Sequence, residues 1–154
     1  MPPNVRRRAP IPKETCPLAL SAEILGDKWS LLIIREAFYG VVRYDDMLAD
    51  IGAPRSMLTD RLSKLVNFGL LKREPYQEPG ERVRHAYVLT GKGRSLGPTL
   101  IALSQWGEEH ILRTPAPVYF VERSSQTSVH HALISDAGIP IALKDVEIKL
   151  RNRE

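Results

Sequence analysis

Residues 44–89 constrain the fold of this chain most, because they carry two helical patterns and then two strand patterns in close succession. In the helical part, apolar side chains recur at three- and four-residue spacing, at Tyr44, Met47, Leu48, Ile51, Leu58, Leu62 and Leu65. This spacing places them on one side of each helix. A short Gly-Ala-Pro turn at 52–54 separates the two helices. The segment therefore predicts a helix-turn-helix, with the second helix at about Pro54 to Phe68.

The outer face of this second helix is polar and basic. The residues opposite or flanking its leucine stripe are Ser56, Asp60, Ser63 and Asn67, with Arg55, Thr59 and Lys64 beside them. Such a face suits contact with DNA, but amphipathic helix pairs are common in proteins that never bind DNA. The pair alone leaves the function open.

A hairpin follows the helix pair and adds the second half of the argument. Residues 70–76 and 83–89 predict two strands, and Pro75 confines the first to a sheet edge. The connection 77–82 has the composition of a turn. Arg82 and Arg84 lie near its tip, where a guanidinium can contact phosphate or enter a minor groove. The alternative is that they belong to a solvated turn. Together these segments predict a winged helix-turn-helix.

Two further helices are predicted upstream. The first begins at Cys16-Pro17 and ends at Gly26, since proline is favoured in the first turn of a helix. Asp27 is a candidate N-cap for the second, which runs to about Phe38. This helix is apolar on nearly all sides, so we expect it at the centre of the core.

Downstream, Thr90 caps a predicted helix that runs to about Leu112, with Pro98 either kinking it or starting its main segment after Gly97. Its apolar stripe includes Leu100, Leu103, Trp106 and His110. The stripe is too apolar for an exposed helix, so we expect it to pack against the same helix of a second subunit. These four residues are the predicted dimer interface.

The predicted fold class is mainly α with a small β wing, a long C-terminal dimerisation helix and a short β-rich tail. Residues 1–14 predict a flexible basic arm with Arg6-Arg7-Arg8, either a solvated tail or a contact to DNA phosphates. Residues 15–113 predict the winged domain with its dimerisation helix. Residues 114–154 predict a small β-rich extension with strands at 118–121, 131–134, 139–142 and 146–150.

Composition excludes several classes of protein. The 154 residues carry a net charge of +4, which suits an anionic partner such as nucleic acid. A single cysteine excludes an internal disulfide and a multi-cysteine metal site. Without a long apolar run or a signal-peptide pattern, we expect a cytoplasmic protein that does not enter membranes. No catalytic, cofactor-binding or metal-ligand spacing is present, so we expect neither an enzyme nor a cofactor or metal.

The segment from Cys16 to His110 resembles the HxlR-type regulators of the MarR-like winged-helix group. The residues that carry the resemblance are Cys16-Pro17, Leu25-Gly26-Asp27-Lys28-Trp29, Arg43-Tyr44, Leu58-Thr59-Asp60-Arg61-Leu62, Gly69-Leu70-Leu71, Arg84, Tyr87-Val88-Leu89-Thr90, Gly93, Leu96, Pro98, Leu103 and Trp106-Gly107. The resemblance implies a dimer on palindromic promoter DNA, with the helix from Pro54 in the major groove and the hairpin as wing. Ala53 departs from it, since many members have Ser or Thr there, and the tail lacks the cysteine pairs found in some members.

We expect Arg55, Ser56 and Thr59 to contact base edges, because they occupy the first turns of the recognition helix. Arg43 and Lys64 are expected at phosphates, together with Arg82 and Arg84. Arg43 could instead anchor a helix, and Asp60 and Arg61 could form a structural pair.

Cys16 is a candidate redox sensor. It lies at a predicted helix N-cap, where the helix dipole favours a thiolate, and some HxlR-type proteins sense oxidants through a cysteine there. The alternative is a small buried hydrophobic residue.

Two other functions stay open. One is a protein-interaction module whose winged helix never binds DNA. The other, compatible with regulation, is binding of a small-molecule effector in a cleft between the dimerisation helix and the winged domain.

Overall fold

The computed structural model describes residues 9–151, and the chain divides into two compact units, one up to Ser95 and one from Leu96 onward. Arg6, Arg7 and Arg8 of the predicted arm lie outside the described residues. The predicted dimerisation helix falls mostly in the second unit, together with the predicted extension.

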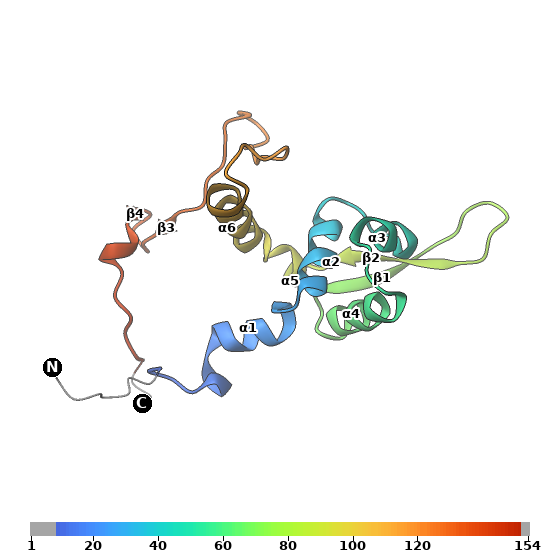
Figure 1. Ribbon diagram of the computed structural model, residues 1–154, viewed down its shortest axis with the longest axis horizontal. Helices are drawn as coiled ribbons and strands as arrows, with labels where there is room; N and C mark the ends of the chain where they lie inside the picture. Colours follow the sequence, from blue (N-terminus) through green and yellow to red (C-terminus); the bar gives the residue numbers. More distant parts are fainter. Residues whose placement is uncertain (1–8, 152–154) are drawn as a thin grey trace. The chain divides into compact units, whose positions relative to one another are not determined.

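The first unit confirms the predicted order of helices and strands. Its elements are η1 (Lys13–Thr15), α1 (Pro17–Leu25), α2 (Lys28–Phe38), α3 (Tyr44–Ile51), α4 (Arg55–Asn67), β1 (Leu71–Tyr76), β2 (Arg84–Leu89) and α5 (Gly91–Arg94). The two strands pair antiparallel, from Leu71 opposite Leu89 to Tyr76 opposite Arg84. Within this unit the helices α2, α3 and α4 gather at the base of the hairpin, whose loop projects beyond them (Figure 1). This arrangement is a winged helix-turn-helix.

The core of the first unit is built around α2 and α4. Ile33 and Ile34 of α2 are fully buried, as are Leu58 and Leu65 of α4. Burying an aliphatic side chain of this size stabilises a fold by about 1.5–3 kcal/mol relative to leaving it exposed. The predicted central position of α2 is confirmed.

The second unit contains α6 (Gly97–Gly107), which continues as a π-helical turn, η2 (Glu108–Leu112). A break after α5 and a new start at Gly97, with Pro98 in the first turn, confirm that the proline begins the main helical segment rather than kinking it. The rest of the unit holds β3 (Leu133–Ile134), β4 (Pro140–Ile141) and a short 3-10 turn, η3 (Leu143–Asp145).

Two of the strands predicted in the extension are wrong. Residues 118–121 form only a single bridge, from Val121 to Ser128, and residues 146–150 have no regular structure. Ile148 is 83% exposed and Leu150 60% exposed, so no buried face fixes a strand register there. Within residues 9–151, no helix combines the length and the apolar character that crossing a bilayer requires.

Candidate nucleic-acid interface

The turn between α3 and α4 depends on Gly52, the C-cap of α3. Its backbone is left-handed, at φ 67° and ψ 27°, a conformation that glycine adopts without the steric cost of a Cβ atom. Ala53 is buried beside it, and Pro54 occupies the N-cap position of α4 without a side-chain capping bond. The start of α4 therefore has no polar side-chain cap, in keeping with the departure from the family at Ala53.

The outer face of α4 is exposed as the periodicity predicts. Arg55, Ser56 and Thr59 are all accessible to solvent, whereas Leu58 and Leu62 on the opposite side lie in the core. The three polar residues are thus available to a partner on one surface. Their contact with bases stays a prediction.

Tyr44 positions this surface, and sequence reasoning missed that role by treating it as an apolar core residue. Its hydroxyl donates to the carbonyl of Arg55 at 3.1 Å and lies 3.1 Å from the Thr59 hydroxyl. The bond ties the start of α3 to the first turns of α4. Two candidate base-contacting residues are therefore held by the neighbouring helix.

Arg61 joins α4 to the N-terminus of α2. Its Nε lies 3.0 Å from the Asp27 carboxylate, and its guanidinium also pairs with Asp60, which confirms the structural pairing. Asp27 caps α2 as predicted, accepting from the Ser30 amide at 3.1 Å and the Ser30 hydroxyl at 2.6 Å. Desolvation by burial raises the pKa of Asp27, but the bonds from Ser30 and Arg61 outweigh it and hold the pKa below its usual range.

Two of the predicted phosphate contacts are paired with carboxylates. The Arg43 guanidinium lies 2.6 Å from Glu78 and 4.7 Å from the centroid of the Tyr76 ring. Its hydrogen bond to Glu78 is the largest cause that raises the pKa of Arg43. No sequence pattern predicts this pair, because its members lie 35 positions apart.

Arg84 has two acidic neighbours, Glu81 at 3.0 Å and Asp45 at 3.4 Å. Arg82 is exposed, and within residues 9–151 it belongs to no ion pair. A phosphate that contacts Arg84 would have to replace these carboxylates. Exposed ion pairs of this kind are weak, at about 0–1 kcal/mol, so the exchange is accessible.

The Lys64 side chain binds another helix of the same chain instead of pointing into solvent. Its ammonium group donates to the Glu23 carbonyl of α1 at 2.7 Å, and the residue is half-buried. This hydrogen bond would have to break before Lys64 could contact phosphate. The phosphate contact of Lys64 stays a prediction.

The predicted dimer residues lie on one side of α6 and η2. Leu103 is 49% exposed and Trp106 is 51% exposed, while Leu100 is half-buried and His110 is exposed. The ring centroids of Trp106 and His110 lie 5.4 Å apart. Because His110 belongs to the π-helical turn, the stripe continues from α6 into that turn.

Cys16 is the N-cap of α1 and makes no side-chain capping bond. Its thiol is free and the residue is half-buried. Among the described residues, no three His, Cys, Asp or Glu side chains gather in a way that could hold a metal ion.

Comparison with known proteins follows this geometry. Residues 24–115 match the family model described as HxlR-like helix-turn-helix. An uncharacterised HTH-type transcriptional regulator of Mycobacterium tuberculosis is 44% identical over 95 residues, which cover 62% of this chain and 59% of the relative. The match thus spans less than two thirds of the relative's length.

Two solved structures extend the likeness. The crystal structure of PA1607, described as a candidate transcription factor, is 34% identical with a TM-score of 0.75 and covers 88% of this chain and 94% of that chain. The redox regulator HypR in its oxidised form is 27% identical with a TM-score of 0.55, covering 62% of this chain and 97% of that chain.

Proposed function

Because the chain belongs to the HxlR-like helix-turn-helix family, we propose that it is a sequence-specific DNA-binding transcriptional regulator that acts as a homodimer on a palindromic promoter site. The observation that carries the proposal is the exposed polar face of α4 beside the projecting β1–β2 hairpin. In this fold α4 enters the major groove and the hairpin contacts the backbone nearby. Family membership also confirms the prediction that the chain is not an enzyme.

The dimer is proposed from the two sides of α6. One side carries the apolar stripe with Leu103 and Trp106, each about half exposed in the single chain. The other side carries Gln105, whose amide bonds to the extension at Val129 and His131. Because the chain's own extension covers the side away from the stripe, a second copy is the occupant that suits the stripe. A two-fold dimer would place two α4 helices about 34–36 Å apart on DNA.

Replacing Arg55 and Arg84 separately tests the assignment of the DNA surface. Arg55→Ala is expected to cost about 1–3 kcal/mol on a specific site, because it removes a base contact. Arg84→Ala is expected to weaken binding evenly across sequences and to flatten the salt dependence, because it removes a phosphate contact. Titrations of selected and random duplexes at several salt concentrations measure both effects. Parent-like binding by both variants would show that the DNA surface is placed wrongly.

The alternative function, a protein-interaction module, makes the opposite prediction for the same experiment. A gel shift with the protein's own promoter region would then show no complex at physiological salt. A sequence-specific shift that competitor DNA does not remove excludes this alternative.

We also propose that Cys16 makes the regulator redox-responsive, on the strength of its position at the start of α1 and the likeness to a named redox regulator. As the chain has one cysteine, a disulfide would link the Cys16 residues of two subunits, with peroxide accepting the two electrons. Mild peroxide is expected to change promoter affinity in the parent and not in Cys16→Ser. An identical response from parent and variant would return Cys16 to a packing role.

A further inference from the structure

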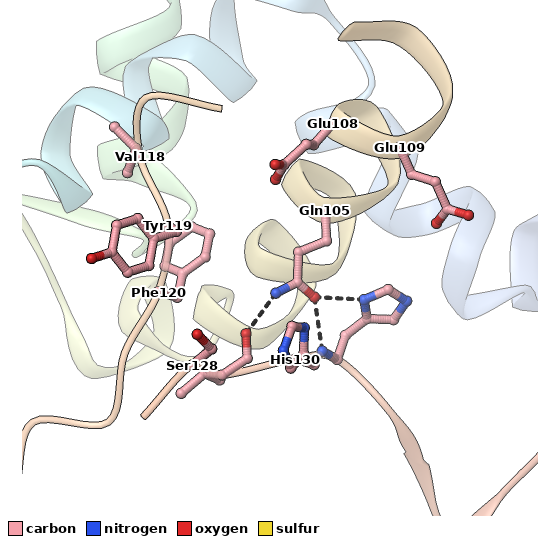
Figure 2. A pocket seen from close by; sticks show the side chains of 10 residues that line it. Gln105, Glu108, Glu109, Val118, Tyr119, Phe120, Ser128 and His130 are labelled. Carbon is pink, nitrogen blue, oxygen red and sulfur yellow. Dashed lines mark hydrogen bonds between the residues drawn. The ribbon is translucent and has the colours of Figure 1, made fainter. Parts of the chain in front are cut away.

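The extension and α6 line a half-open cavity that the regulator function does not use. Its volume is about 600 Å³, within the usual range of small-molecule sites. Figure 2 shows Glu108 projecting from the helix on the side of the segment that carries Tyr119 and Phe120, and Gln105 projecting toward the segment that carries Ser128 and His130. All of these residues belong to the second unit.

Gln105 gives the cavity a fixed wall. Its amide nitrogen donates to the Val129 carbonyl at 2.7 Å, and its amide oxygen accepts from the His131 backbone at 2.8 Å. The Val129 amide in turn donates to the Phe120 carbonyl at 2.8 Å. These bonds tie the segments 118–120 and 128–131 to one helical side chain, so the cavity does not depend on a ligand for its shape.

The helix itself is altered at the cavity. The Arg113 amide donates to the Glu108 carbonyl at 2.8 Å, five residues back, which makes this a π-helical turn. Such turns are rare and often lie at functional sites. Here the wide turn begins at the residue that lines the cavity with a carboxylate.

The ionisable groups at the cavity favour a cation. Among the described residues that line it, the acidic side chains are Glu108 and Glu109, the imidazoles are His130 and His131, and no lysine or arginine is present. One carboxylate oxygen of Glu108 accepts from the Ala116 amide at 2.9 Å, which leaves its second oxygen available. An anionic ligand would meet two like charges, and only the imidazoles of His130 and His131 could compensate them.

The aromatic side chains indicate that the ligand also has an apolar part. Tyr119 is 74% exposed in the single chain and Phe120 is half-buried beside it. An aromatic face attracts an ammonium group, and the ring also covers a hydrocarbon body. We propose that this cavity binds a small organic ammonium ion with an apolar body, held by the Glu108 carboxylate and the Tyr119 ring.

Calorimetric titration of the full chain without DNA tests this proposal, using 2-phenylethylammonium as the probe. We expect saturable binding at one probe per chain, about tenfold tighter than the neutral 2-phenylethanol because of the charge-assisted contact. Phenylacetate, the anion of similar size, is expected to bind more weakly than the alcohol. Because DNA is absent, the result does not depend on the proposed regulator function.

Glu108→Gln keeps the acceptor for the Ala116 amide and removes the charge, so we expect about tenfold weaker binding of the cation with circular dichroism unchanged. Glu147→Gln is the matched control, since Glu147 lies in the exposed tail beside Lys149 and away from the lining, and it should bind like the parent. Four results would each overturn the proposal. They are equal affinity for the cation and the alcohol, preference for phenylacetate, absence of binding, and a Glu108→Gln variant that binds the cation as tightly as the parent.

Discussion

Alanine at position 93 is expected to lower the free energy of unfolding by about 3 kcal/mol, at the upper end of the usual cost of overpacking. A Cβ atom on Gly93 would lie 2.1 Å from the Leu70 carbonyl oxygen and 2.9 Å from a methyl group of Leu89. The carbonyl cannot retreat freely, because it accepts from the Thr90 amide at 3.0 Å and from the Thr90 hydroxyl at 3.2 Å. The substitution therefore forces backbone apart at the junction of β1, β2 and α5.

Gly91→Ala is the matched control in the same short helix. Apart from its chain neighbours and the backbone of its own helix, no atom lies within 4 Å of a Cβ atom built on Gly91. This alanine is expected to be neutral or to stabilise by about 0.4–1 kcal/mol, through reduced freedom of the unfolded chain. Urea unfolding of both variants measures the difference. Equal midpoints would mean that α5 does not approach Leu70 as closely as the structure indicates.

The second large effect is expected for Leu103→Asp. Leu103 lies in the middle of the apolar stripe of α6, and an aspartate buried in a subunit interface would be unpaired. We expect a monomer that contacts one half-site at a time. Loss of the second, linked contact should weaken binding to a selected operator by about 100-fold or more.

Light scattering and DNA titration together test this dimer. Ile148→Asp makes the same kind of change at a residue that is 83% exposed and lies outside α6, so it should leave both the mass and the affinity of the parent unchanged. On a duplex with a single half-site, the parent and Leu103→Asp should bind DNA with similar affinity, because only one α4 helix can then make its contact. A monomeric Leu103→Asp with parent-like operator affinity would contradict the proposed dimer.

The sequence by itself determined the elements of the winged unit, because each depends on signals a few residues apart. Asp27 caps α2 with its own side chain, and Gly52 ends α3 through its backbone conformation. The leucine spacing in α4 separated the buried face from the exposed one. The same local logic failed in the extension, where the apolar residues at 146–150 have no facing strand among residues 9–151.

Tertiary structure alone decided how the polar side chains are used, because their partners are far apart in sequence. Lys64 donates a hydrogen bond to the Glu23 carbonyl, and Arg43 forms an ion pair with Glu78 in the protein without DNA. The cavity beside α6 likewise exists because Gln105 bonds to a loop more than twenty residues later. A long polar side chain has many reachable partners of similar energy, so only the packed chain selects one.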